Sequence, residues 1–230
     1  MTTLKRNNTI VLIIGRKGSG KSTLARVMVP KLGNRIIILD PLHEYSGGVI
    51  CHSFDQFRRS IKSLYDSYEI RYYSDPTNDN RPLDYSKIPF RYVLRFDNDS
   101  YYDKAVGLTR NLGHCWIVIE EITHFVSTYH KSENFDRIIR YARHTNVSVL
   151  MISQRCAEIP RLYTSQADSV ISFKQSEPRD IEYLSKVGIV GKAGSEKVQT
   201  LPVFEYPKSK KDLIRVLDEC SITFPDDSTD

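Results

Sequence analysis

The sequence predicts an α/β fold with a mostly parallel central sheet and helices on both of its faces. Two early segments, residues 9–14 and 35–40, are nearly continuous runs of apolar, largely β-branched residues, which is typical of strands buried on both sides. Apolar residues at helical spacing follow each of them. The same order of strand and helix recurs later in the chain, and this repetition is the pattern of a parallel sheet.

The first strand leads through a loop into a helix. The strand, TIVLII at residues 9–14, ends at Gly15. From Lys21 the apolar residues fall at helical spacing, and Gly33 provides a stop. We therefore expect strand, loop and helix in immediate succession.

The remaining elements are predicted from the same two patterns, apolar runs for strands and apolar residues at helical spacing for helices. The second strand ends at Pro41, which has no N–H to continue a ladder, and Ser53 is a suitable cap for the helix that follows. Residues 90–97 alternate apolar residues with polar ones, which predicts a strand with one solvent-facing or functional side. The other predicted elements are helices at residues 54–65, 132–144, 179–187 and 209–219, strands at 115–121, 147–154, 169–173 and 198–207, and a surface loop at 74–86.

Length and composition favour one globular domain. The 230 residues are 40% hydrophobic and 27% charged, which fits a chain that folds around one sizeable core. We expect this core at about residues 9–185, with residues 186–230 as a strand and helix extension that ends in an acidic tail. No apolar run reaches the ~18–20 residues of a transmembrane segment, and the polar start lacks a secretory signal, so a cytoplasmic location is expected.

Neither the cysteines nor the net charge identifies a ligand. The four cysteines form no CxxC pair, so we interpret them as buried thiols rather than zinc ligands or a disulfide framework: Cys51, Cys115, Cys156 and Cys220. The formal charge of +5 is mild. Between Lys131 and Arg161 six basic residues stand against three acidic ones, which is compatible with nucleic-acid contact or with an ordinary charged helix face.

The loop after the first strand has the spacing of a phosphate-binding motif. Gly15, Gly20, Lys21 and Ser22 satisfy G-x-x-x-x-G-K-[ST], in which backbone N–H groups wrap a phosphate. The lysine would reach the β- and γ-phosphates of ATP, and the serine hydroxyl would bind Mg²⁺. The two basic residues at the loop tip either add phosphate contacts or are merely solvated. The predicted nucleotide-binding residues are Gly15, Arg16, Lys17, Gly18, Ser19, Gly20, Lys21, Ser22 and Thr23.

Two adjacent carboxylates end a later buried strand. Glu120 and Glu121 follow an apolar run, and the carboxyl ends of parallel strands are where such sheets gather their ligand groups. Glu120 would hold Mg²⁺ through water, and Glu121 would polarise the attacking water as general base. A neutral amide, Gln154, ends another strand and could donate to the γ-phosphate or to that water. The second acid favours a hydrolase of the RecA-like, additional-strand (ASCE) class of P-loop NTPases over transfer of phosphate to a small metabolite.

A fourth segment makes the chain resemble a known family. Residues 38–47, ILDPLHEYSG, resemble the segment after the second strand of HerA-like ATPases, an apolar strand followed by Asp-Pro-His-Gly-Glu-Tyr. With the acidic strand and the segment RHTNVSVLMISQR, the chain is similar to the FtsK/HerA superfamily of ring-shaped DNA translocases over roughly residues 9–185. Within the motif Asp40, Pro41, Glu44 and Tyr45 match in register, whereas Leu42 and His43 replace the usual His-Gly pair.

The resemblance implies an architecture and an assembly. The glutamine-bearing strand is expected between the phosphate-loop strand and the acidic strand. The family also implies a ring, usually a hexamer, with ATP at each subunit boundary and double-stranded DNA in the central channel, contacted through its backbone without sequence preference. The first acidic position is usually Asp, so Glu120 keeps the charge and lengthens the reach to Mg²⁺.

The superfamily further needs an arginine that completes the site of a neighbouring subunit. Arg143, before the glutamine strand, fits the family pattern best, and Arg140 is next. Arg155 and Arg95 are further candidates for this role, ranked after these two. For each of them, a surface arginine or a structural salt bridge is the alternative interpretation.

The small size narrows the resemblance to the genome-packaging ATPases of internal-membrane, double-jelly-roll viruses. That implies an ATP-driven motor that pumps viral DNA into a preformed capsid, with capsid-vertex or inner-membrane proteins as docking partners and the host cytoplasm or the virion as location. Three alternatives stay open. They are a cellular HerA-like or conjugation-type translocase, a Zot-like morphogenesis switch at a membrane, and a small-molecule kinase, against which the paired glutamates and Gln154 argue.

Overall fold

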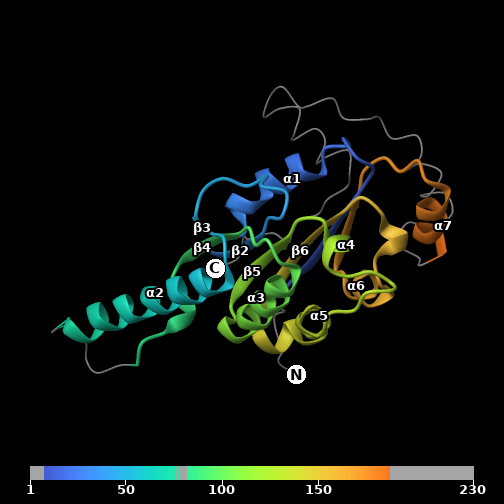
Figure 1. Ribbon diagram of the computed structural model, residues 1–230. Coiled ribbons are helices and arrows are strands. Elements are labelled where there is room, and N and C mark those ends of the chain that lie inside the picture. Colours follow the sequence, from blue (N-terminus) through green and yellow to red (C-terminus); the bar gives the residue numbers. More distant parts are fainter. Residues whose placement is uncertain (1–7, 76, 78–81, 187–230) are drawn as a thin grey trace, which may run out of the picture.

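The computed structural model describes residues 8–75, 77 and 82–186 (Figure 1). The strand predicted at residues 198–207, the helix at 209–219 and the acidic tail lie outside these ranges. The organisation of residues 1–230 as a single domain therefore stays a prediction.

One sheet of seven parallel strands forms the centre of the described chain, in the order β3-β4-β2-β5-β6-β1-β7. The strands are β1 (Ile10–Ile14), β2 (Arg35–Leu39), β3 (Val49–Cys51), β4 (Phe90–Leu94), β5 (Cys115–Ile119), β6 (Val147–Ser153) and β7 (Ser169–Ser172). The expected parallel sheet is confirmed. Because β6 lies between β1 and β5, the strand that precedes Gln154 separates the phosphate-loop strand from the acidic strand, as in the predicted RecA-like (ASCE) P-loop NTPase fold.

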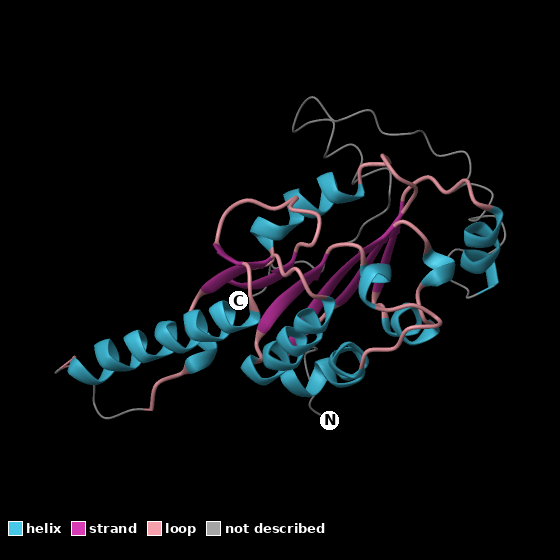
Figure 2. Cartoon of the chain, viewed as in Figure 1, coloured by secondary structure: helices cyan, strands magenta, loops and turns pink. Residues whose placement is uncertain are grey.

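Helices cover both faces of this sheet (Figure 2). Alternate residues of β1 point into two cores: Leu12 and Ile14 lie in one, and Ile13 lies in the other. The first core also takes buried residues of α2, α3 and α5, whereas α1 packs against the second. The helices are α1 (Lys21–Met28), α2 (Phe54–Ser74), α3 (Asp99–Leu112), α4 (Ile122–Phe125), α5 (Glu133–Thr145), α6 (Arg161–Gln166) and α7 (Pro178–Lys186), with 3-10 turns η1 (Val29–Lys31), η2 (Tyr85–Lys87) and η3 (Cys156–Glu158).

Helix α2 is longer than the sequence pattern predicts. Ser53 caps it as expected and accepts a hydrogen bond from the Gln56 N–H at 3.2 Å. The predicted end at residue 65 is wrong, since the helix continues to Ser74 and projects beyond the sheet (Figure 1). Its buried residues are Phe57 and Ile61 in the first half, so the second half carries no core-facing period from which its length could be predicted.

Of the two alternatives for the strand at residues 90–97, a solvent-facing or a functional side, the solvent-facing one is wrong. β4 ends at Leu94 and is paired on both sides, with β2 and with β3. Val93, on the same face as Arg91, is completely buried, and Arg95 lies beyond the strand. An interior strand of a parallel sheet buries both faces, so polar alternation does not mark a face in contact with water.

The described part of the chain fits the other general expectations. No helix in it is long and apolar enough to cross a membrane. Cys51, Cys115 and Cys156 are free, buried thiols, as predicted, while Cys220 lies outside the described ranges. Burial raises the pKa of Cys51 to about 11, so this thiol is neutral near pH 7.

Candidate nucleotide site

The phosphate-binding motif forms a tight loop between β1 and α1. Its backbone takes left-handed angles at two glycines, with φ of 74° at Gly18 and 99° at Gly20. Gly15 has another reason to be glycine, because an added Cβ would lie 2.6 Å from the Cβ of Phe173. The Gly15 N–H donates to the Ser153 carbonyl at 3.2 Å, which ties the start of the loop to the end of β6.

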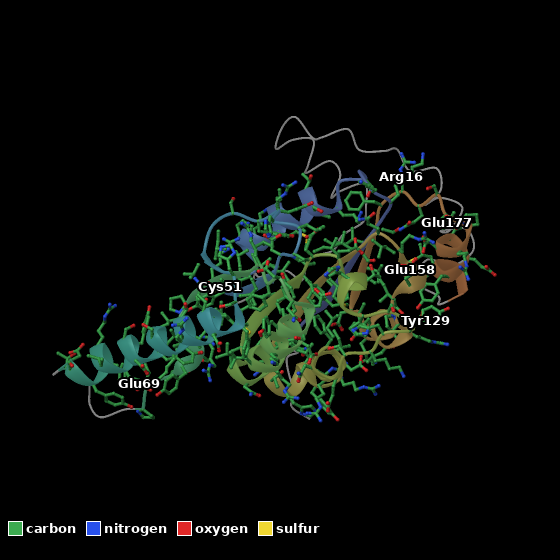
Figure 3. All side chains as sticks on the ribbon, viewed as in Figure 1. Arg16, Cys51, Glu69, Tyr129, Glu158 and Glu177 are labelled. Atoms are coloured by element: carbon green, nitrogen blue, oxygen red, sulfur yellow. The ribbon has the colours of Figure 1, made fainter. Side chains whose placement is uncertain are left out.

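The two basic residues at the loop tip differ in their surroundings. Lys17 is exposed, which fits a solvated side chain. Arg16 is half-buried, lies at the carboxyl edge of the sheet (Figure 3), and its N–H donates to the Lys174 carbonyl at 3.0 Å. Among the described residues, neither Arg16 Nε nor the Ser19 hydroxyl has a hydrogen-bond partner, although both atoms are buried. Buried donors of this kind are suited to phosphate oxygens.

Lys21 and Ser22 open helix α1, with Thr23 half-buried in the same turn. Lys21 is 6% exposed, and its ammonium donates to the Arg16 carbonyl at 3.0 Å. Burial lowers its pKa, while Glu121, Glu120 and Glu44 oppose that shift through their charges. A phosphate oxygen is a stronger acceptor than a neutral carbonyl, so Lys21 is placed to exchange this partner for a phosphate.

Glu120 is held between two hydroxyl groups. It follows β5 directly, is 3% exposed, and its N–H donates to the Leu39 carbonyl at 3.1 Å. The Ser22 hydroxyl donates to Oε1 and the Tyr45 hydroxyl to Oε2, both at 2.8 Å. Burial raises the pKa of Glu120, and these two hydrogen bonds oppose the increase. The predicted metal residues, Ser22 and Glu120, are therefore in direct contact.

Glu121 lies beside it in an unusual backbone conformation, with φ of 54° and ψ of 73°. Its Oε1 accepts hydrogen bonds from the Thr123 hydroxyl, from the Ser153 hydroxyl at 3.1 Å and from the Gln154 N–H at 3.3 Å. The other oxygen, Oε2, takes no hydrogen bond from the described residues. A non-glycine residue in the left-handed region costs free energy, and the hydrogen bonds to Glu121 help to hold it in this conformation.

Gln154 directly follows β6 and is half-buried beside Glu121. Its backbone contacts Glu121, as expected for a residue at the carboxyl end of the neighbouring strand. The Ser153 side chain makes the closer contact with Glu121, at 3.1 Å compared with 3.3 Å for the Gln154 N–H.

The loop after β2 contributes contacts that sequence reasoning missed. Asp40 is completely buried and accepts the N–H groups of Glu44 at 2.7 Å and Tyr45 at 3.2 Å. Arg95 Nε donates to the same carboxylate at 3.0 Å, and another Arg95 nitrogen donates to the Tyr45 carbonyl at 2.5 Å. The motif match marked Asp40 and Tyr45 but gave neither a role, because the partner Arg95 is 55 positions from Asp40 in sequence.

The arginines considered for a neighbouring site fall into two groups. Arg95 is used within the chain by Asp40, and Arg155 Nε lies 2.9 Å from Asp180 Oδ2 as an ion pair without hydrogen-bond alignment. Arg140 and Arg143 are exposed on α5. Arg143 precedes β6 and Gln154 follows it, so Arg143 lies toward the opposite edge of the sheet from the phosphate loop of its own chain. That Arg143 acts in the site of a neighbouring subunit stays a prediction.

Replacing Glu120 with Gln is expected to stabilise the ligand-free protein at neutral pH. Burial raises the pKa of Glu120, so the ionised carboxylate is less favourable in the folded chain than in the unfolded one. Below the unfolded pKa the carboxyl is protonated in both states and this cost is absent; it appears as pH rises through the folded pKa. The stability difference between variant and parent should grow to on the order of 1 kcal/mol at neutral pH.

Urea unfolding over a pH series from acid to neutral measures that difference. Glu133→Gln, at an exposed position on α5, is the matched control and should show no such growth. A Glu120→Gln difference that stays constant over the whole pH range would contradict the prediction.

Comparison with known proteins identifies the fold. No protein-family model matches the sequence, and no curated protein matches it significantly. Solved structures do match. The genome packaging NTPase B204 from Sulfolobus turreted icosahedral virus 2, in complex with ATP-gammaS, is 24% identical with a TM-score of 0.64, over 86% of this chain and 89% of that one.

Two related structures match similarly. The complex of the same NTPase with AMPPCP is 22% identical with a TM-score of 0.60, over 86% of this chain and 90% of that one. B204, the DNA-packaging ATPase from Sulfolobus Turreted Icosahedral Virus, is 23% identical with a TM-score of 0.56 and the same coverage. The strand order, the phosphate loop and these similarities together show that the chain has the P-loop NTPase fold of the viral packaging NTPase B204.

Proposed function

We propose that this chain is a Mg²⁺-dependent ATPase that packages viral DNA. The observation that carries the proposal is the 2.8 Å hydrogen bond from Ser22 to Glu120, with the second carboxylate, Glu121, beside it. It joins a phosphate loop and an acidic strand end, the two halves of the proposed ATPase site, across 98 positions of the sequence. The two groups meet at the carboxyl edge of a parallel sheet, where ligands bind in this class of fold.

The residues fit a magnesium ion. Ser22 and Glu120 would hold the ion, since they offer a hydroxyl and a carboxylate oxygen, the ligand types that Mg²⁺ prefers. Three carboxylates, those of Glu44, Glu120 and Glu121, act electrostatically on the single ammonium of Lys21. A bound cation would offset this excess of negative charge and stabilise the transferring phosphate.

The two glutamates suit different tasks. Glu120 uses both oxygens to accept hydrogen bonds within the chain, which suits a fixed residue that orients a metal. Glu121 is anchored through Oε1, which leaves Oε2 to accept a proton from an attacking water. Gln154, whose N–H donates to Glu121, is our candidate for a donor to the same water or to the γ-phosphate.

Translocation of double-stranded DNA by a ring is the finer part of the proposal. It is supported by the similarity of the fold to the DNA-packaging ATPase B204 and by exposed basic residues on α5. In such a ring, DNA would be bound without sequence preference, because phosphate contacts by basic side chains are independent of base sequence and weaken with salt. Exposed Arg143 is our candidate for the residue that reaches a neighbour's ATP in a hexamer.

The ATPase rate with and without duplex DNA, combined with a mass measurement in the presence of ATP and Mg²⁺, tests the proposal. We expect DNA to raise the rate at low salt and to lose this effect as the salt concentration rises, with a ring-sized assembly in the mass measurement. A strict monomer whose ATPase rate is indifferent to DNA would rule out the translocase. Phosphate transfer to a small molecule, without hydrolysis, would indicate a kinase instead.

A further inference from the structure

The loop after β2 brings a tyrosine onto the predicted metal carboxylate. Tyr45 is 3% exposed, and its hydroxyl donates to Glu120 Oε2 at 2.8 Å. We infer that Tyr45 is a positioning residue, which holds Glu120 in the orientation that receives the divalent cation of the nucleotide. This inference rests on the proposed function and adds to it a residue outside the phosphate loop and the acidic strand.

The tyrosine is itself held by other residues of the chain. Buried Asp40 accepts its N–H at 3.2 Å, and Arg95 donates to its carbonyl at 2.5 Å while also pairing with Asp40 at 3.0 Å. The backbone of Tyr45 is therefore held on both sides by one ion pair. Its side chain packs in the core between α1 and the sheet, which limits the movement of the ring.

Glu120 needs such support because of its length. A glutamate has one more rotatable bond than an aspartate, so a carboxylate at this position has more orientations available. Ser22 restrains one oxygen and Tyr45 the other, and the two hydroxyls together select one orientation. A hydrogen bond to a charged group is worth enough free energy that its loss is expected to weaken a dependent binding equilibrium about tenfold.

A purely structural role for the hydroxyl is the competing explanation, since buried tyrosines usually find a hydrogen-bond partner. The two explanations differ in one observable. A structural role lowers stability without changing the response to metal, whereas a positioning role changes the concentration of Mg²⁺ that promotes nucleotide binding.

The variant Tyr45→Phe removes the hydroxyl and keeps the ring. Its matched control is Tyr163→Phe. Tyr163 lies on α6, is buried like Tyr45, and donates to the Asp136 carboxylate at 2.8 Å. Binding of a fluorescent ATP analogue to the full chain is measured during a Mg²⁺ titration and again in EDTA. We expect the half-saturating Mg²⁺ concentration to rise about tenfold for Tyr45→Phe and to stay unchanged for Tyr163→Phe, with binding in EDTA equal for all three proteins.

The results separate this inference from the proposed function. If binding by the parent chain does not respond to Mg²⁺, the metal-dependent function is wrong. If the parent responds and Tyr45→Phe has the same half-saturating concentration, the function survives and the positioning role is overturned.

A double-mutant cycle gives a second measurement. In a Glu120→Gln background, Tyr45→Phe should cause no further change in the response to Mg²⁺, because the residue that it positions has lost its charge. Additive effects would overturn the inference. Should Tyr45→Phe fail to fold, Glu120→Asp takes its place, because the shorter side chain cannot keep both hydroxyl contacts. An unchanged half-saturating Mg²⁺ concentration in that variant would overturn the positioning role of Tyr45.

Discussion

Glu121→Gln is expected to leave ATP binding intact and to lower kcat by about 10²–10⁴-fold, the usual contribution of a general base. The amide keeps the size of the side chain and can still accept the hydrogen bonds from Ser153 and the Gln154 N–H through its oxygen. It cannot take the proton of the attacking water. Affinity for a fluorescent ATP analogue and the rate of phosphate release, measured on the same preparation, test both halves of the prediction.

The control for this variant is Glu133→Gln, which removes a carboxylate from an exposed i,i+4 pair with Arg137 on α5. It should hydrolyse ATP at the parent rate. Hydrolysis at the parent rate by Glu121→Gln would show that another group takes the proton. A loss of ATP binding in that variant would instead assign Glu121 to the binding of nucleotide.

Asp40→Ala is expected to be the most destabilising single change considered for this chain, at about 3–5 kcal/mol. Asp40 is completely buried and accepts two backbone N–H groups, and its removal leaves those donors unpaired. The side chain of Arg95, only 16% exposed, loses its counter-ion at the same time. Urea or thermal unfolding measures the loss of stability.

Asp55→Ala is the matched control, because Asp55 pairs with Arg58 at 3.8 Å and both side chains are largely exposed. An exposed pair of this kind contributes at most about 1 kcal/mol. An equal loss of stability in the two variants would show that the buried ion pair contributes no more to the free energy of unfolding than the exposed one. A large loss confined to Asp40→Ala would explain why an aspartate follows the second strand of this sheet.

Most of the architecture follows from local pattern. The strands at β1, β2, β5 and β6 are apolar runs, and a run buried on both faces can be recognised without knowing its neighbours. The elements that the sequence missed lack such a pattern. β3 has three residues, α3 buries one large side chain, Tyr102, among small and polar ones, and the second half of α2 buries none.

Part of the candidate site could also be predicted from local sequence. The phosphate loop is continuous in sequence, so its glycines, Lys21 and Ser22 could be assigned from spacing alone. Glu120 and Glu121 could be assigned because strand ends of a parallel sheet meet at one edge.

The sequence by itself determined the fold class, the phosphate loop and the two carboxylates, because each depends on residues close together along the chain. Only the tertiary structure decided that the Ser22 and Tyr45 hydroxyls donate to the two oxygens of Glu120. It also decided that Arg95 pairs with Asp40 of its own chain. These contacts join residues 98, 75 and 55 positions apart, so they exist only where the sheet order β4-β2-β5-β6-β1 brings the strand ends side by side.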